Sequence, residues 1–335
     1  MTVAAVTGGA GFIGSNFVLD WCAQTQETVL NIDKLTYAGN LENLASLQNN
    51  AQHIFVQADI ANGDLMLELL TKHQPRAIIN FAAESHVDRS IHGPAEFIQT
   101  NIVGTFNLLE SVRAYYEKLG DGQKNRFRFL HVSTDEVYGE LHNPEEFFLE
   151  TTSYDPRSPY SASKASSDLI ALSYVTTHGL PVVVTRCSNN FGPYQFPEKL
   201  IPLFTTNLLD GKKVPLYGDG GNVRDWIHVE DHNIAAHLVL QKGEVGQVYN
   251  IGAHNEITNR EITYRLLELC GRDESSITPV ADRLGHDRRY SVYIDKVSAL
   301  GWKLSRTFED SLAETVEWYR NNRAWWEPLK ARAGL

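Results

Sequence analysis

Cysteine and long apolar runs are both scarce in this 335-residue chain. Its three cysteines, Cys22, Cys187 and Cys270, lie far apart and form no Cys-x-x-Cys motif, which argues against a disulfide framework and favours a reducing compartment. No apolar run approaches the roughly 18 residues that would span a bilayer. The first residues also lack the basic and then apolar pattern of a secretory leader. We therefore expect a cytoplasmic protein that does not enter a membrane.

Basic residues are in the minority. Lys and Arg number 30 against 41 Asp and Glu, for a net charge of -11. A nucleic-acid partner would need a basic face, so we expect none. A small anionic ligand needs only a few local Arg or Lys side chains and is compatible with this charge. The fractions of hydrophobic (42%) and charged (21%) residues are those of an ordinary globular protein, long enough for one large or two smaller domains.

Short apolar runs alternate with helical patterns through the first half of the chain. Helical patterns cover Leu65–His73, Ala95–Leu119 and Tyr160–His178. This alternation predicts an α/β fold, a Rossmann-type doubly wound parallel sheet with both faces covered. The runs expected to be buried strands are Val3–Thr7, Thr28–Asp33, His53–Ala58, Ala77–Phe81, Phe127–Ser133 and Pro181–Arg186.

The residue composition of the chain changes after Arg186. Turn formers and aromatic residues crowd 189–197, and Pro and Gly recur through residue 221, which favours short elements and loops. We expect a smaller, interleaved C-terminal substrate domain. The first domain should cover 1–188, with 225–252 returning to it through a strand at Val248–Ile251, and the second should consist mainly of 189–335.

A glycine-rich loop follows the first expected strand. It reads Thr-Gly-Gly-Ala-Gly-Phe-Ile-Gly, with Gly8, Gly11 and Gly14 at three-residue intervals. Such glycines permit a tight turn and close approach of a pyrophosphate to a helix N-terminus. Asp33 ends the second strand about twenty residues later, where a carboxylate accepts from ribose hydroxyls and repels a 2′-phosphate. The pattern predicts NAD rather than NADP; the alternative is a plain strand-to-helix turn.

Two polar patterns have competing interpretations. Asp59, at the end of the third strand, is a candidate adenine contact or a cap of the following helix. His228 and His232 have the i, i+4 spacing of a metal site. Asp231, however, is expected to cap a helix that starts there, so the two imidazoles would not share one helical face. We expect no metal.

Tyr160 and Lys164 form a Tyr-x-x-x-Lys pair within a helical pattern. They lie one turn apart on the same helix face. A free tyrosine has a pKa near 10, but an ammonium ~4 Å away at an effective dielectric of about 20 would favour tyrosinate by about 4 kcal/mol, or roughly three pKa units. This predicts a general base near neutral pH. The alternative is a surface helix pair.

Thr134, Asp135 and Glu136 directly follow the apolar run Phe127–Ser133. Ligands of open α/β sheets bind beyond the carboxyl ends of the strands, where these residues should lie. Two carboxyl groups in different surroundings take different pKa values, so one can serve as acid and the other as base. Thr134 offers a hydroxyl to a sugar oxygen or simply caps the strand end. The alternative for the acidic pair is a solvated turn.

These residues belong to longer motifs that resemble the extended short-chain dehydrogenase/reductases, and within them the sugar-nucleotide 4,6-dehydratases. The Asp135-Glu136 pair is the most discriminating, because related epimerases, decarboxylases and GDP-mannose dehydratases generally lack it. The resemblance covers nearly the whole chain. It is carried by the segments Thr7–Ser15, Ala82–Ser90, Ser133–Gly139, Tyr160–Lys164, Arg186–Asn190, Pro197–Pro202, Asn222–Trp226 and Gly285–Tyr290.

The resemblance implies a reaction and its catalytic residues. Tyr160 would take the proton of a sugar 4-hydroxyl while hydride passes to NAD, Glu136 would remove the C5 proton, and Asp135 would protonate the departing 6-hydroxyl before the hydride returns to C6. The product of dTDP-glucose would be its 4-keto-6-deoxy derivative, as in deoxysugar biosynthesis. The alternatives are an epimerase or decarboxylase of the same fold, or a non-catalytic NAD-sensing regulator. The implied catalytic set is Thr134, Asp135, Glu136, Tyr160 and Lys164.

The resemblance also implies two sets of binding residues, with the first domain holding NAD and the second mainly the sugar nucleotide. Arg224 is a candidate pyrophosphate ligand or a surface partner of Asp225 or Asp219, and Lys199 is a candidate ligand or a solvated helix residue. The cofactor set is Gly8, Gly11, Phe12, Ile13, Gly14, Asp33, Lys34, Leu35, Thr36, Asp59, Ile60, Ala82, Ala83, Ser85, Thr100, Tyr160, Lys164 and Asn190. The substrate set is Ser85, Thr134, Asn189, Lys199, Leu200, Pro215, Tyr217, Arg224, Asn259 and His286.

Three positions depart from the family pattern. Leu284 stands where many members have Pro, Tyr293 where many have an acid, and Phe191 where Tyr is frequent. These changes leave the reaction intact and leave fine substrate preference, such as dTDP against UDP, open. The helical patterns 95–119 and 160–178 have wide apolar faces, and the resemblance implies a homodimer that pairs them in a four-helix bundle.

Overall fold

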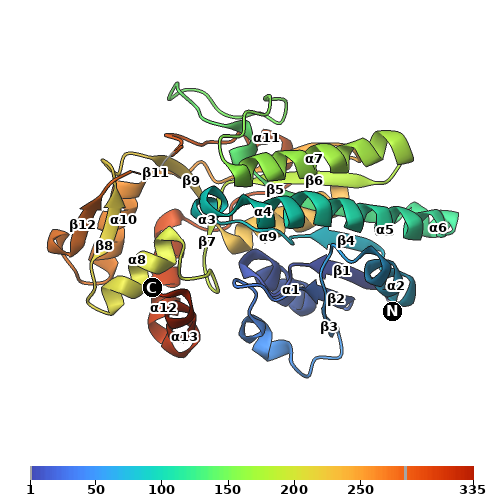
Figure 1. Ribbon diagram of the computed structural model, residues 1–335, viewed down its shortest axis with the longest axis horizontal. Coiled ribbons are helices and arrows are strands. Elements are labelled where there is room, and N and C mark those ends of the chain that lie inside the picture. Colours follow the sequence, from blue (N-terminus) through green and yellow to red (C-terminus); the bar gives the residue numbers. More distant parts are fainter. Residues whose placement is uncertain (1, 283–284) are drawn as a thin grey trace.

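A seven-stranded parallel sheet forms the centre of the computed structural model, which describes residues 2–282 and 285–335 (Figure 1). The strand order is β10-β6-β5-β4-β1-β2-β3, and every neighbouring pair is parallel. The order reverses between β1 and β4, so the crevice of a doubly wound fold lies there. The strands are β1 (Val3–Thr7), β2 (Thr28–Asp33), β3 (His53–Gln57), β4 (Ala77–Asn80), β5 (Arg128–Thr134), β6 (Val182–Cys187) and β10 (Val248–Ile251).

Helices cover both faces of this sheet, as the sequence predicts. Strand side chains alternate between two buried clusters, so Ala4 and Val6 face one layer and Ala5 the other. The first layer contains α1 (Phe12–Gln24) and α9 (Val229–Lys242), and the second contains α2 (Gly63–His73), α5 (Thr105–Glu117) and α7 (Pro159–His178). The predicted fold class is confirmed, and so is the strand at Val248–Ile251, which joins β6 in parallel.

The helix predicted for Ala95–Leu119 is not uniform. It consists of α4 (Pro94–Phe97), a π-helical stretch η2 (Ile98–Gly104) and then α5. Within η2 the Asn101 amide bonds both backbone groups of Glu84 and the hydroxyl of Ser163. The wider π turn thus accompanies a side chain that ties the segment after β4 to α7, and π turns often mark functional sites.

A smaller group of elements lies beyond the carboxyl edge of the sheet, on the left of Figure 1. Its own apolar cluster includes Phe191, Phe204 and Leu266. One sheet has the order β11-β9-β7, with β11 (Glu256–Thr258), β9 (Val223–His228) and β7 (Asn189–Phe191), and another pairs β12 (Ile277–Val280) with β8 (Val214–Tyr217). Around them pack α8 (Leu200–Leu209), α10 (Asn259–Leu269), α12 (Phe308–Asn321) and α13 (Arg323–Ala333). The remaining short elements are η1 (Leu41–Leu47), α3 (Val87–His92), α6 (Asp121–Lys124), η3 (Asp135–Tyr138), η4 (Glu274–Ser276) and α11 (Asp295–Ser298).

The prediction that Asp231 caps a helix is wrong. Helix α9 begins at Val229, and the His228 ring accepts a hydrogen bond from the Glu230 amide as its N-cap. The Asp231 carboxylate lies within the first turn and instead accepts from the backbone N–H and hydroxyl of Ser305. None of the helices in the two described stretches is long and apolar enough to cross a bilayer.

Candidate active site

A cavity of about 300 Å³ opens at the carboxyl ends of the central strands. Its walls come from the β1–α1 loop, from the ends of β2, β3, β4, β5 and β6 and the residues after them, and from η2 and α7. All predicted cofactor residues line it except Leu35, whose backbone N–H instead donates to the Asp33 carboxylate. The lining set is Gly8, Gly11, Phe12, Ile13, Gly14, Asp33, Lys34, Thr36, Asp59, Ile60, Ala82, Ala83, Ser85, Thr100, Tyr160, Lys164 and Asn190.

The glycine loop explains why small residues are needed here. A Cβ on Gly8, which has φ +71°, would lie 2.6 Å from the backbone N of Ala82, and one on Gly14 would lie 2.3 Å from the carbonyl oxygen of Gly8. A Cβ on Gly11 would meet only that carbonyl, at 3.3 Å. Gly11 is also the N-cap of α1 and supplies no side-chain cap, so the first amides of α1 suit an anion such as a pyrophosphate.

Asp33 is held rigidly at the end of β2. Its carboxylate accepts from the amides of Ala10 at 2.9 Å and Leu35 at 2.7 Å. Burial raises the pKa of Asp33, and these backbone hydrogen bonds oppose the rise. A carboxylate oriented in this way is an acceptor for ribose hydroxyls and unfavourable for a 2′-phosphate. The residues present therefore fit NAD.

The helix-cap interpretation of Asp59 is wrong. Helix α2 is capped by Asn62, whose side chain accepts from the Leu65 amide. The Asp59 carboxylate accepts from the Ala61 amide and lies 2.8 Å from the Lys34 ammonium. Both side chains line the cavity, and the adenine contact of Asp59 stays a prediction.

The predicted acidic pair lies in η3, the single turn that follows β5. Thr134 is its N-cap, because its hydroxyl accepts from the Glu136 amide at 3.3 Å, and it also contacts the Asp135 carboxyl at 3.3 Å. Thr134 thus has the capping role, while its contact with a sugar stays a prediction. Glu136 faces the cavity with Thr134, whereas Asp135 is not among the lining residues.

Asp135 has the surroundings of a neutral acid. It is 2% exposed, and burial, followed by the charges of Glu136 and Asp225, raises its pKa well above the ordinary range of a carboxyl. Its Oδ2 is buried and has no hydrogen-bond partner among the described residues. A buried carboxyl with a raised pKa next to a cavity-facing Glu136 is the asymmetry that separate acid and base roles need.

The expectation that Lys164 lowers the pKa of Tyr160 is wrong for this structure. Burial raises the pKa of Tyr160 well above its usual value, Glu136 adds to the rise, and a hydrogen bond from Thr134 opposes it. The Lys164 ammonium donates instead to the carbonyl of Val132 at 2.8 Å. Desolvation outweighs the attraction assumed from helix spacing, because the helix places both side chains inside the protein.

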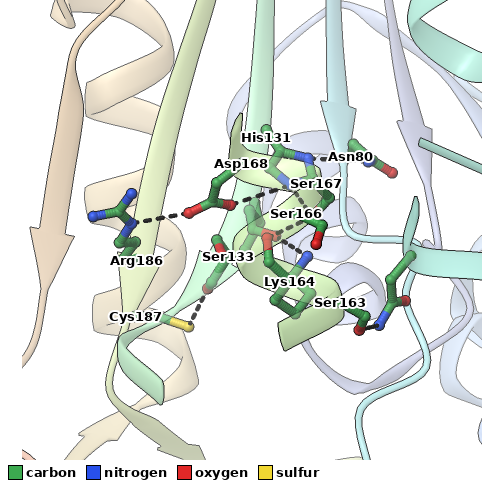
Figure 2. Close-up of polar contacts among 12 residues, drawn as sticks. Asn80, His131, Ser133, Ser163, Lys164, Ser166, Ser167, Asp168, Arg186 and Cys187 are labelled. Carbon is green, nitrogen blue, oxygen red and sulfur yellow. Dashed lines mark hydrogen bonds and ion pairs between the residues drawn. The ribbon is translucent and has the colours of Figure 1, made fainter. Parts of the chain in front are cut away.

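A buried polar network fixes the helix that carries both residues (Figure 2). The Asp168 carboxylate bonds the Nε of Arg186 at 2.9 Å and lies 3.5 Å from the Nε2 of His131. That ring also contacts the hydroxyl of Ser167 and, through its Nδ1, the amide of Asn80. The network joins α7 to β4, β5 and β6 directly behind Lys164.

We predict that Asp168→Asn lowers the free energy of unfolding by about 3–5 kcal/mol, because it leaves the Arg186 guanidinium buried without its countercharge. Urea denaturation checks this value. Glu309→Gln is the matched control, since it removes the exposed ion pair with Arg265 and should cost at most about 1 kcal/mol. Equal losses in the two variants would contradict the prediction.

The predicted substrate residues divide into two groups. Ser85, Thr134, Asn189 and Lys199 line the cavity, and the Lys199 ammonium donates to the Ser85 carbonyl at 3.0 Å. The others lie outside its lining, on the elements around it: Leu200 on α8, Pro215 and Tyr217 on β8, Arg224 on β9, Asn259 at the start of α10, and His286. Arg283 and Leu284, part of one sequence departure, lie outside the described residues.

Arg224 is not the surface residue of the alternative interpretation. It is buried, its guanidinium donates to the carbonyls of Val223 and Asp287, and it stacks 4.3 Å from the ring centroid of Tyr290. The carboxylate of Asp219 pairs with Arg288 instead. Neutral carbonyl partners leave the positive charge of the Arg224 guanidinium available for a pyrophosphate. The pyrophosphate role of Arg224 itself stays a prediction.

Several cavity residues have no sequence signal of their own. Tyr37, Glu84, Phe196 and Glu198 line the cavity; Glu84 and Glu198 lie within family motifs, but none of the four was assigned a role from the sequence. Tyr37 follows Asp33 within one loop, and Glu198 precedes the predicted ligand Lys199. Membership of those motifs and proximity to predicted ligands are the signals that could have located them.

Fold and site together define the class of the protein. A glycine-rich dinucleotide loop, a buried Tyr-x-x-x-Lys pair and a cavity at the switch point of a doubly wound sheet are typical of extended short-chain dehydrogenase/reductases. The family model described as GDP-mannose 4,6 dehydratase matches residues 5–315. The chain belongs to that family.

Within the family, the chain is similar to dTDP-glucose 4,6-dehydratases along nearly its whole length. It is 51% identical to dTDP-glucose 4,6-dehydratase 1 of Escherichia coli (strain K12), over 98% of this chain and 95% of that protein. A dTDP-glucose 4,6-dehydratase from Streptomyces venezuelae, solved with NAD and TYD bound, has a TM-score of 0.92 and 49% identity over 98% of this chain and all of that one. A UDP-glucose 4-epimerase from Thermotoga maritima is more distant, with a TM-score of 0.85 and 32% identity over 96% of this chain and all of that one.

Proposed function

We propose that this protein is an NAD-dependent hydro-lyase that converts dTDP-glucose to dTDP-4-keto-6-deoxyglucose. The observation that carries the proposal is the asymmetric pair in η3, in which buried Asp135 has a raised pKa and Glu136 faces the cavity. The similarity to dTDP-glucose 4,6-dehydratases supports it. An epimerase, a decarboxylase or a cofactor-sensing regulator needs no such pair, so these alternatives are not favoured.

The first step is removal of the proton from the sugar 4-hydroxyl by Tyr160. Held by the glycine loop and Asp33, NAD would supply the hydride acceptor for C4 and, once reduced, the hydride donor for C6. Lys164 lines the same cavity and donates to the carbonyl of Val132, while burial lowers its pKa. The hydroxyl of Thr134 stabilises the tyrosinate by the hydrogen bond that opposes the raised pKa of Tyr160.

The second step is loss of water across C5 and C6. A ketone at C4 acidifies the C5 proton, and Glu136 is the base that removes it from the cavity side. Asp135 gives its proton to the C6 hydroxyl, which leaves as water. Asp135 is more deeply buried than Glu136, so Asp135 suits the role of proton donor and Glu136 that of proton acceptor.

We also propose that the sugar nucleotide lies mainly against residues 189–335, while 1–188 with 225–252 hold NAD. Asn189 and Lys199 face the cavity, and Arg224 and His286 would extend the site toward the pyrophosphate and base. The test is turnover of dTDP-glucose against UDP-glucose at equal concentration, followed by mass spectrometry. We expect loss of one water with a higher kcat/KM for dTDP-glucose; a higher value for UDP-glucose would contradict the nucleotide assignment.

We propose that the protein is a homodimer that works in the cytoplasm. Ile98, Phe106 and Leu169 are large apolar side chains exposed on η2, α5 and α7. These helices pack side by side (Figure 1), so two copies related by a two-fold axis would bury them in a four-helix bundle. Exposed apolar side chains on adjacent helices are a common mark of an interface.

Leu169→Glu is expected to produce a monomer, because it places a charge on that apolar surface. Leu169 is 55% exposed. Sedimentation velocity at micromolar concentration measures the result. Ile234→Glu is the control, since Ile234 is 44% exposed on α9, the opposite layer, and its substitution should leave the dimer intact. A dimeric Leu169 variant would refute this interface.

A further inference from the structure

Glu198 joins three separate segments at the edge of the cavity. It precedes α8, whereas Tyr37 follows β2 and Arg89 belongs to α3. The Tyr37 hydroxyl donates to its Oε1 at 2.9 Å, and the Arg89 guanidinium donates to its Oε2 at 3.2 and 3.0 Å. Tyr37 and Glu198 both line the cavity. We call Tyr37, Arg89 and Glu198 the Glu198 clamp.

Further contacts stiffen the clamp. The Arg89 guanidinium lies 3.8 Å from the ring centroid of Tyr37, a cation–π distance. The same ring meets Phe196 edge-on at 5.5 Å. The two walls of the cavity, one from the loops after β2 and β4 and one from the segment before α8, are therefore joined through side chains.

Burial makes the clamp strong. The Glu198 side chain is 7% exposed while that of Arg89 is 44% exposed, so a mostly buried carboxylate depends on these donors. Hydrogen bonds to a charged group are about twice as strong as neutral ones. His86 lies 3.7 Å from the carboxylate, but burial and the charge of Lys199 lower its pKa to about 4. His86 is thus neutral at physiological pH, and Arg89 is the charged donor of the clamp.

We propose that the Glu198 clamp is a latch that must open for NAD to enter or leave the cavity. The proposal rests on the proposed function in one respect, that NAD is the occupant. In that reaction the hydride taken from C4 must return to C6 of the same sugar, so a cofactor that left in mid-cycle would strand the sugar as a ketone. A latch across the cavity meets this requirement without a contact to the reacting atoms.

The test measures NAD exchange in the absence of any sugar. The full-length protein is loaded with radiolabelled NAD and chased with unlabelled NAD, and association is followed by mixing NAD-free protein with NAD. Glu198→Gln, which keeps the size of the side chain but removes its charge, should raise both rates by about tenfold or more. Tyr37→Phe should raise the association and dissociation rates by a smaller factor. The double variant Tyr37→Phe with Glu198→Gln should have rates only slightly above those of Glu198→Gln, because both substitutions break the same contact.

The control is Glu309→Gln, which removes an exposed ion pair between α10 and α12 and should leave both rates unchanged. Unchanged rates in Glu198→Gln and Tyr37→Phe would overturn the latch. Faster dissociation with unchanged association would overturn it too, since Glu198 would then be a contact of the bound cofactor. If the variants exchange NAD faster as expected but the unmodified protein does not dehydrate dTDP-glucose, the latch is supported and the proposed reaction is overturned.

Discussion

Tyr160→Phe should lower kcat with dTDP-glucose by roughly 10²–10⁴, because it removes the hydroxyl that takes the proton from the sugar. NAD binding and the unfolding midpoint should change little, since the ring still packs against Phe97. Steady-state kinetics, with NAD content measured on the same preparation, checks both parts.

Tyr174→Phe is the matched control on the same helix. Its hydroxyl bonds Glu110 at 2.6 Å, away from the cavity, so kcat should stay close to that of the unmodified protein. A Tyr160 variant that retains most of its turnover would mean that another group takes the proton. A Tyr160 variant that has also lost NAD would contradict the expectation that the ring alone maintains the cofactor site.

Glu136→Gln and Asp135→Asn should each lower the rate by roughly 10²–10⁴, but at different steps. Glu136→Gln removes the base, so the C5 proton should no longer exchange with deuterated solvent. Asp135→Asn removes only the acid, so C5 exchange should continue while loss of water slows. Nuclear magnetic resonance of the sugar in deuterated buffer separates the two results.

Persistent C5 exchange in Glu136→Gln would contradict its assignment as the base. Fast loss of water in Asp135→Asn would contradict the acid. The raised pKa of Asp135 also fixes the direction of the pH dependence. The protonated form is the active one, so kcat should fall as pH rises through the pKa of Asp135, and this fall should disappear in Asp135→Asn.

The sheet could be predicted because its strands are short, apolar runs buried on both faces. β1, β2 and β10 begin and end where the sequence predicts, and the others agree to within a residue or so. The dinucleotide cavity could be predicted from Gly8, Gly14 and Asp33, since only a few backbone geometries place a glycine-rich loop and a later strand-end carboxylate at this spacing. These features depend on local sequence and on rules of strand order.

Features that depend on distant contacts could not be predicted. The pKa of Tyr160 is set by burial in a site assembled from β5, β6 and α7, which helix spacing alone does not describe. Asp59 and Asp231 look like helix caps in sequence, but Asn62 and His228 are the N-caps of those helices. The contacts of Glu198 span 161 and 109 residues, so no local pattern indicates them.

The most direct test of the proposed reaction follows one hydrogen through it. dTDP-glucose deuterated at C4 is incubated with the NAD-loaded protein, and the product is examined by mass spectrometry and nuclear magnetic resonance. We predict that the product has lost one water, carries a ketone at C4 and has the deuterium at C6. A product of unchanged mass with the deuterium back at C4 would identify an epimerase and contradict the dehydration.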